Sequence, residues 1–229
     1  VRVVEPVWTP DGDYIVVRRQ NLGEGGGGSG LWMYHRDGGQ GVELVSSSDE
    51  GGAAWPSVSR DGRYLYFHVL DGGAGLAGRD ALAGQWQVRR KDLETGEVVS
   101  VSSGEAAQQI RGSSGSAYAP EVSPDGRWLA FARRIPNGTI SFKRHRFGPR
   151  TALWLRDLRT GAERLLMDPV TQDNAEGIKT LRIMPGYDWS DDGASLILSQ
   201  GGKIRRLDVA SGEVTTIPFR ARVQRTASE

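Results

Sequence analysis

The sequence has no cysteine among its 229 residues, which excludes disulfide bonds, thiolate metal sites and a cysteine nucleophile. It also has no apolar run near the ~20 residues that a membrane-spanning helix needs. Charge of one sign is not in excess, because 29 basic residues face 28 acidic ones and the formal net charge is +1. This balance argues against a general nucleic-acid-binding surface. The chain opens at Val1 without a methionine or a signal-type segment, which fits a mature or excised piece.

Glycine is abundant, with 32 residues, and many glycines stand in turn-forming pairs. The stretch Pro120–Arg134 reads PEVSPDGRWLAFARR and places such a pair between a short strand, Glu121–Ser123, and an apolar strand, Trp128–Ala132. An Asp-Gly pair favours a two-residue hairpin because both positions tolerate positive φ. Related stretches occur four times in all. The four pairs are Asp11-Gly12, Asp61-Gly62, Asp125-Gly126 and Asp192-Gly193. Four related segments at such spacing indicate a repeat architecture.

A second signal follows each Asp-Gly turn and has the form strand, turn, strand. Its copies span Leu31–Gly39, Val88–Gly96, Leu153–Gly161 and Ile204–Gly212. Each repeat therefore holds four strands, A to D, with tight turns between A and B and between C and D. No segment shows a convincing helical period. The sequence predicts an all-β fold, a β-propeller with four recognisable four-stranded blades.

The repeats place the blades at about 1–45, 55–102, 118–167 and 185–219, and residues 220–229 form a linker or tail. The long connections join strands B and C or lead from strand D into the next strand A. In an antiparallel meander both kinds emerge at the same end of the strands, and the tight turns emerge at the other. Insertions on one face of a repeat protein are where binding tends to lie, so we expect function on the long-connection face.

The pattern P-x-h-S-P-D-G-R-h-h-h-F, followed by L-x-h-x-D-L-x-T-G, resembles the TolB-type, WD-like propeller repeat. The segment 201–219 is similar to the last blade of the propeller region that precedes a metal-dependent amidohydrolase domain in fused bacterial proteins. Arg60 and Asp191 depart from the motif, which prefers proline there. TolB-type rings usually have more than four blades, so the resemblance implies that this chain belongs to a larger ring. A periplasmic or secreted location is the corresponding expectation.

The residues offer no catalytic constellation. The run Gly23–Gly28 has the spacing G-x-G-x-x-G, but no helix follows that could bind a phosphate, so a flexible loop is the favoured interpretation. His35, His68 and His145 lie in three different blades without the spacing of metal ligands. We therefore expect no catalytic residue, no metal site and no cofactor within this chain.

The acidic residues of the repeat fall into two groups. The turn aspartates are expected to bond their own backbone and to have a structural role, rather than to act as ligands or acids. Glu121 and Asp188 lie instead on strand A, the innermost strand of a blade, beside the central channel. The pair could bind a cation, but two carboxylates are too few for a calcium cage, and a solvated channel lining is favoured.

One basic patch stands out on or beside the connection between strands B and C of the third blade. It could receive an anionic ligand or an acidic partner, although a solvated loop is the favoured interpretation because the overall charge is balanced. Its residues are Arg133, Arg134, Lys143, Arg144, His145 and Arg146.

Two classes of function remain. The chain is either a non-catalytic module that binds a protein or a substrate on its long-connection face, or the propeller portion of an amidohydrolase, gating or orienting a catalytic domain that follows it. The expected partner is accordingly another protein or an adjacent domain of the same polypeptide. Blades stack face to face, so uncovered blade faces would also permit self-association.

Overall fold

The computed structural model describes residues 1–20, 29–46, 48, 52–71, 85–101, 117–135, 141–142, 145–146, 150–170 and 186–222. Within these ranges the side chains of residues 70, 71, 85, 134, 135, 141, 142, 145, 146 and 150 are not described. The regular elements of the described residues are strands, and they pair into four antiparallel sheets of four strands and one small ladder.

Each sheet is a blade whose strands follow one another in sequence order. Blade 1 holds β1 (Arg2–Trp8), β2 (Tyr14–Gln20), β3 (Ser29–His35) and β4 (Val42–Val45). Blade 2 holds β5 (Ala54–Val58), β6 (Tyr64–Asp71), β7 (Gln85–Asp92) and β8 (Val98–Ser100). Blade 3 holds β9 (Tyr118–Val122), β10 (Trp128–Ile135), β13 (Arg150–Asp157) and β14 (Glu163–Met167), with the ladder β11 (Ser141–Phe142) and β12 (His145–Arg146) between β10 and β13. Blade 4 holds β15 (Tyr187–Trp189), β16 (Ser195–Gln200), β17 (Lys203–Asp208) and β18 (Val214–Thr216).

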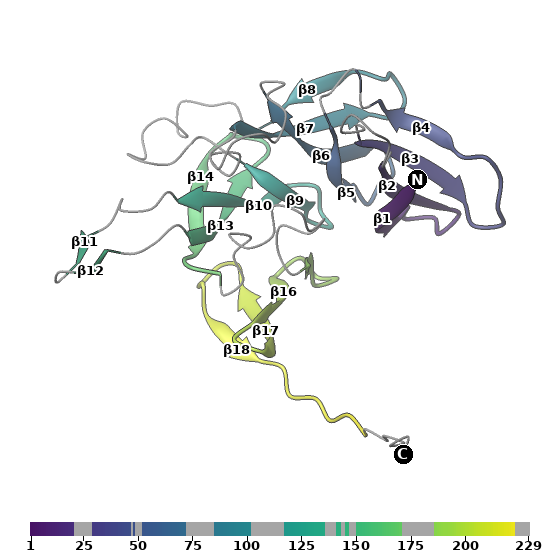
Figure 1. Cartoon of the computed structure of the whole chain (residues 1–229). Helices are drawn as coiled ribbons and strands as arrows, with labels where there is room; N and C mark the ends of the chain where they lie inside the picture. The colour runs from purple at the N-terminus through teal and green to yellow at the C-terminus, as the bar shows by residue number, and fades with distance from the viewer. Residues whose placement is uncertain are drawn as a thin grey trace, which may run out of the picture.

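The four blades follow one another around an arc, with blade 1 at one end and blade 4 at the other (Figure 1). The first strands of the blades, β1, β5, β9 and β15, lie innermost and contact one another in succession. The predicted all-β propeller of four four-stranded blades is confirmed.

The turn between the first two strands of a blade is longer than the sequence predicts. Ser123 donates its backbone N–H to the carbonyl of Trp128 at 2.8 Å, so four residues, not two, separate the paired positions. Gly126 has a φ of +68° and donates to the carbonyl of Ser123, whereas Asp125 has no positive φ. The prediction of a two-residue hairpin is therefore wrong. The two strands are joined by a four-residue loop with one left-handed glycine.

Side chains explain why the longer loop is stable. The Asp125 carboxylate accepts hydrogen bonds from the Ser123 hydroxyl at 2.5 Å and from the backbone N–H of Arg127 at 3.0 Å. The Ser123 oxygen in turn accepts the N–H of Trp128 at 2.8 Å. The same pattern recurs in the other three blades around the pairs Thr9/Asp11, Ser59/Asp61 and Ser190/Asp192. Local hydrogen bonds to the backbone thus account for the recurring Ser/Thr-x-Asp-Gly sequence.

Arginine joins this turn to the second tight turn of the blade. Arg63 donates hydrogen bonds from Nε and Nη2 to Oδ2 of Asp92, at 3.0 and 2.8 Å. The other carboxylate oxygen of Asp92 accepts the backbone N–H of Glu94. Arg127 and Asp157 form the equivalent pair in blade 3. Both turns at this end of the strands are therefore fixed by their own side chains.

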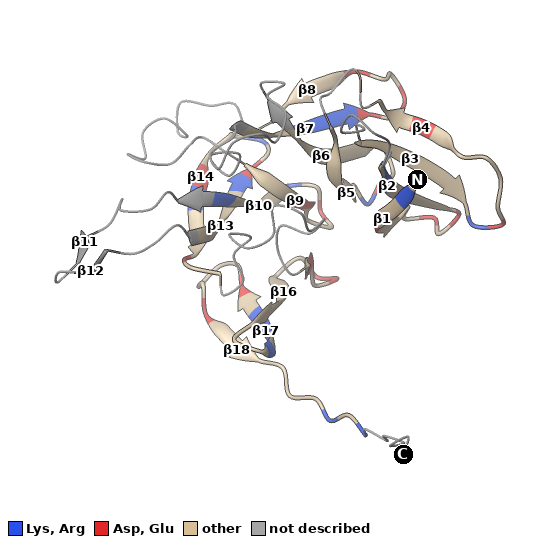
Figure 2. Cartoon of the chain, viewed as in Figure 1, with Lys and Arg blue, Asp and Glu red and all other residues tan. Residues whose placement is uncertain are grey.

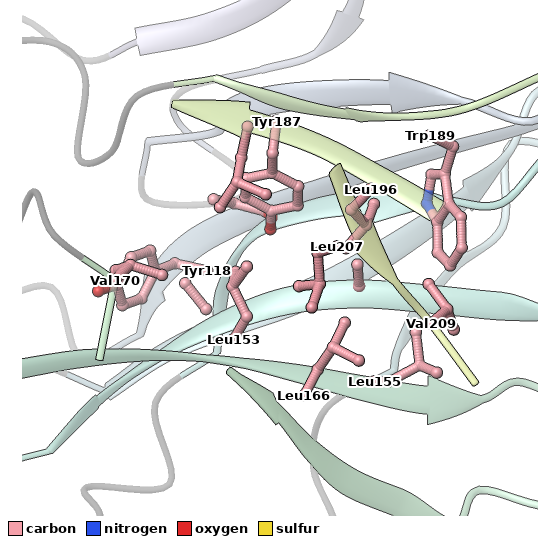
Figure 3. Close-up of a cluster of buried hydrophobic side chains, with 14 of the residues drawn as sticks. Tyr118, Leu153, Leu155, Leu166, Val170, Tyr187, Trp189, Leu196, Leu207 and Val209 are labelled. Atoms are coloured by element: carbon pink, nitrogen blue, oxygen red, sulfur yellow. The ribbon is translucent and has the colours of Figure 1, made fainter. Parts of the chain in front are cut away.

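The core lies between the blades. One cluster joins blades 1 and 2 around Val16 and Phe67, and another joins blades 2 and 3 around Tyr66 and Phe131. A third joins blades 3 and 4, where Leu153, Leu155 and Leu166 pack against residues that include Leu196, Leu207 and Trp189 (Figure 3). Each central blade buries both faces, as propeller blades do.

Candidate binding pocket at the hub

Three of the four innermost strands, β1, β5 and β9, share a bend that the sequence analysis did not predict. Glu5, Trp55 and Ala119 each stand six residues before the turn aspartate and have φ values of 55°, 54° and 52°. The pairing registers of β1, β5 and β9 shift at these points, which marks a β-bulge in each strand. Glycine, as Gly186, takes this position in blade 4. Left-handed backbone at residues other than glycine is costly, so neighbouring groups must hold it in place.

Neighbouring blades supply those groups. Glu5 accepts the backbone N–H of Trp55 at 2.7 Å, and His68 of blade 2 accepts the N–H of Ala119 through Nδ1 at 3.1 Å. Tyr187 of blade 4 donates its hydroxyl to the carbonyl of Ala119. Burial lowers the pKa of His68 to about 3, with a smaller contribution from Arg18, so the imidazole is neutral and serves as an acceptor. His68 is thus a structural residue at the contact between blades 2 and 3.

The bulged strands surround a hollow of about 180 Å³ at the hub. All four blades contribute to its walls, and the aromatic rings of Trp55 and Tyr187 lie 6.2 Å apart. Its lining residues are Glu5, Pro6, Val7, Trp55, Pro56, Glu121, Gly186, Tyr187 and Asp188. The sequence argument places Glu121 and Asp188 beside a central channel, and in the structure both line this hollow. The contribution of Glu5, Trp55 and Tyr187 to a hollow was not predicted. Proline follows the left-handed residue in three blades, and it was an available signal for a bend in the chain.

Glu121 is the most perturbed acid of the hollow. Its Oε1 accepts the indole N–H of Trp55 at 3.0 Å, and its backbone carbonyl accepts the indole N–H of Trp189 at the same distance. Desolvation raises the pKa of Glu121 to about 8, the charge of Asp188 adds to this rise, and the hydrogen bonds from Trp55 and Ser57 oppose it. Glu121 therefore holds its proton through most of the neutral range.

Asp188 differs from Glu121 because its side chain is exposed at the rim of the hollow. Glu5, the third carboxylate, is already paired with Arg18 at 3.3 Å and with the N–H of Trp55. Among the described residues no group of three or more His, Cys, Asp or Glu side chains could hold a metal ion. Asp188 is thus the exposed carboxylate at the rim, and its Oδ1 also accepts the backbone N–H of Trp189 at 2.8 Å.

The turn residues Asp11, Gly12, Asp61, Gly62, Asp125, Gly126, Asp192 and Gly193 lie at the other end of the strands. Each aspartate bonds its own loop, as described above. The hydroxyl of Thr9 is the main cause that lowers the pKa of Asp11, and Ser190 acts in the same way on Asp192. These carboxylates are ionised and satisfied by hydrogen bonds within their own loops.

The predicted basic patch does not include Arg133. That side chain is 1% exposed, lies 2.8 Å from the Glu163 carboxylate, and packs over the ring of Trp154. The structure thus places Arg133 away from the surface, with its guanidinium facing a carboxylate of its own blade. Lys143 and Arg144 lie outside the described residues, and for Arg134, His145 and Arg146 only the backbone is described. Elsewhere, basic and acidic residues are interspersed along the described strands and turns (Figure 2).

No known family model matches the sequence, and no curated protein matches it. Solved structures do match. A putative TolB from Agrobacterium tumefaciens is 17% identical, with a TM-score of 0.60, over 93% of this chain and 63% of its own length. An acylaminoacyl peptidase from Pyrococcus horikoshii is 13% identical, with a TM-score of 0.54, over 94% of this chain and 32% of its own. A hydrazine synthase from Kuenenia stuttgartiensis is 15% identical, with a TM-score of 0.54, over 88% of this chain and 51% of its own.

This chain has a TolB-like propeller fold. The resemblance seen in its repeats is thereby confirmed at the level of the fold, while fusion to an amidohydrolase stays a prediction. The chain spans less than two thirds of each of these structures. The described part of the chain holds no helix with the length and apolar character to cross a bilayer.

Proposed function

We propose that this chain is a non-catalytic binding module that receives a basic side chain or terminal ammonium of a partner protein in the hub hollow. The observation that carries the proposal is the composition of the hollow. Aromatic walls from Trp55 and Tyr187 stand beside the exposed carboxylate of Asp188. A cation that contacts aromatic faces and a carboxylate is stabilised both by the quadrupole of the rings and by the ion pair.

The position of the hollow supports the same proposal. Its residues stand four to six positions before the turn aspartate of each blade, on or beside the innermost strands. The tight turns at one end of these strands are occupied with their own hydrogen bonds. A partner would approach the module from the long-connection face, and the basic residues Lys143, Arg144, His145 and Arg146 would offer it a second, oppositely charged contact.

Selection from a random peptide library, followed by calorimetry on the selected peptides, tests this proposal. Asp188→Asn should weaken peptide binding by about tenfold, the typical effect of losing one charge-assisted contact. Arg159→Glu, in the tight turn at the other end of the strands, is the matched control and should leave affinity unchanged. Selected peptides without basic residues, or equal losses in the two variants, would reject the proposal.

A second candidate is the propeller portion of a hydrolase. It is favoured by the match to an acylaminoacyl peptidase whose chain is about three times longer than the matched region. For this chain the repeats resemble those that precede an amidohydrolase domain, in which metal chemistry would lie outside residues 1–229 and the location would be periplasmic or secreted. The sequence of the parent reading frame decides this candidate, because an amidohydrolase requires an H-x-H strand after Glu229.

A further inference from the structure

The contact between blades 2 and 3 shows how two blades of this chain fit together. On the blade-3 side, Val122, Phe131 and Trp154 belong to a buried cluster that also contains Tyr66 and Val88 of blade 2. Arg133 lies on the same side of β10, with its guanidinium carbon 5.0 Å from the Trp154 ring. On the blade-2 side, the Ser57 hydroxyl accepts the backbone N–H of Val122 at 3.2 Å.

Blade 1 repeats the blade-3 side of this contact on its open end. We call Trp8, Val17, Arg19 and Trp32 the blade-1 end face. Counted from the turn aspartate, the first three stand where Val122, Phe131 and Arg133 stand in blade 3. Trp32 corresponds to Trp154 by strand pairing, because Val17 pairs with Trp32 as Phe131 pairs with Trp154.

The resemblance extends to the stacking of side chains. The guanidinium carbon of Arg19 lies 4.3 Å from the Trp32 ring, as Arg133 lies over Trp154. Exposure differs at Trp8, which is 55% exposed whereas Val122 is 8% exposed, while Val17 is buried like Phe131. Blade 1 thus presents a surface that is open at Trp8 and has the composition of a blade-to-blade contact.

Blade 4 repeats the blade-2 side on the opposite end of the arc. We call Asp188, Ile197, Ile204 and Arg206 the blade-4 end face. They hold the register positions of Ser57, Tyr66, Val88 and Arg90 in blade 2, because Ile197 pairs with Asp188 and with Arg206 as Tyr66 pairs with Ser57 and with Arg90.

Both polar residues of the blade-4 end face suit a blade contact. An arginine is accommodated at this position in blade 2, where Arg90 lies 4.5 Å over the Tyr64 ring. Asp188 carries acceptor oxygens where Ser57 accepts the N–H of Val122. Ile204 is 39% exposed, so this face, too, is open.

We propose that two copies of this chain associate head to tail, with the blade-4 end face of one copy packed on the blade-1 end face of the other. The occupant is a second copy because this one chain carries both halves of a contact that it already forms between blades 2 and 3. In the docked pair, Asp188 accepts the backbone N–H of Trp8. The indole N–H of Trp8 bonds the carbonyl of Asp188, as that of Trp189 bonds the carbonyl of Glu121. The contact joins two different surfaces, so each copy keeps one open end.

Sedimentation equilibrium on the chain and two charged variants tests this arrangement. The wild-type chain should show a mass that rises with concentration. Trp8→Glu and Ile204→Glu should each sediment as monomers, with association weakened about 30-fold or more, as loss of a buried interface anchor typically causes. An equimolar mixture of the two variants should form dimers again, because each retains the face that the other lacks. Val42→Glu is the control, since Val42 is 59% exposed but lies on the outermost strand of blade 1.

The mixture also shows that both variants are folded, since an unfolded chain cannot restore association. A wild-type chain that stays monomeric at about 100 µM, where a micromolar contact would be saturated, would overturn the proposal. The proposal would also be overturned if Trp8→Glu abolished association and Ile204→Glu did not. That result would indicate that two blade-1 end faces pack together. Loss of association in Val42→Glu would likewise assign the contact to another surface.

Discussion

Replacing Glu121 by glutamine should make the protein more stable, and increasingly so as the pH rises. Glutamine keeps the shape of the side chain and an oxygen that can accept the indole N–H of Trp55. It removes a carboxyl group whose pKa is raised to about 8 in the folded chain from an ordinary value of 4.5. The unfolded chain releases this proton near pH 4.5, whereas the folded chain retains it, so stability of the wild type falls between pH 4.5 and 8.

The size of this effect follows from the same two pKa values. Each tenfold difference in proton affinity is worth about 1.4 kcal/mol, so the full difference sets an upper limit of about 5 kcal/mol above pH 8. The hollow admits water to one side of the carboxyl group, which reduces its desolvation, and we expect about 2 kcal/mol at pH 9. At pH 4 the carboxyl group is mostly protonated in both the folded and the unfolded chain. The free energy of unfolding of the variant should then match that of the wild type.

Urea denaturation followed by tryptophan fluorescence at pH 4, 7 and 9 measures this difference. Asp188→Asn separates the two causes of the raised pKa, because it removes the repulsion between the two carboxyl groups but leaves Glu121 desolvated. This variant should therefore show only part of the stability that Glu121→Gln gains. Parallel stability profiles for the wild type and Glu121→Gln would refute the assignment of a buried, protonated carboxyl group.

Three further predictions concern the turns and the long connections. Gly126→Val should lower the free energy of unfolding by about 1–2 kcal/mol, since the φ of +68° is strained for a side chain, while Gly186→Ala, with no atom within 4 Å of the added carbon, should have little effect in the same denaturation assay. Asp157→Ala should cost more than Arg127→Ala, about 2 against about 0.5 kcal/mol, because the carboxylate also accepts two backbone N–H groups. Arg144→Glu combined with Arg146→Glu should weaken binding of an acidic partner in calorimetry, whereas Arg159→Glu should not.

The blades could be predicted from the sequence because their signals are local. The pair Asp125-Gly126 marks the turn whatever surrounds it, and the apolar run after Trp128 marks the strand. The length of the loop could not be read from that pair alone, since it depends on the hydrogen bonds that join Ser123, Asp125 and Trp128. Local signals therefore identified the element and misjudged its geometry.

Residues whose role depends on distant partners were harder to predict. Arg133 stands in a basic stretch, yet its burial follows from Glu163 and Trp154, which come from two other strands. The left-handed backbone of Ala119 depends on His68 in one neighbouring blade and Tyr187 in the other. Pro120 signals a bend beside Ala119, but no neighbouring residue identifies the partners in the other blades or the burial of Arg133, so the walls of the hollow emerge only when the blades are assembled.

The tight turns and the hub hollow differ in how their polar groups are used, and this difference supports the proposed binding site. At the tight-turn end, Asp125 and Asp157 are bonded to their own loops and to arginine, so a ligand there would have to displace hydrogen bonds that hold the blade together. At the hub, Glu121 holds a proton and Asp188 is exposed at the rim of the hollow, so a cation can gain charge pairing without breaking a structural contact. A cation bound there would also favour loss of the Glu121 proton, and binding should therefore strengthen as the pH rises toward 8. Affinity that stays constant from pH 6 to pH 9 would place the ligand elsewhere on the propeller.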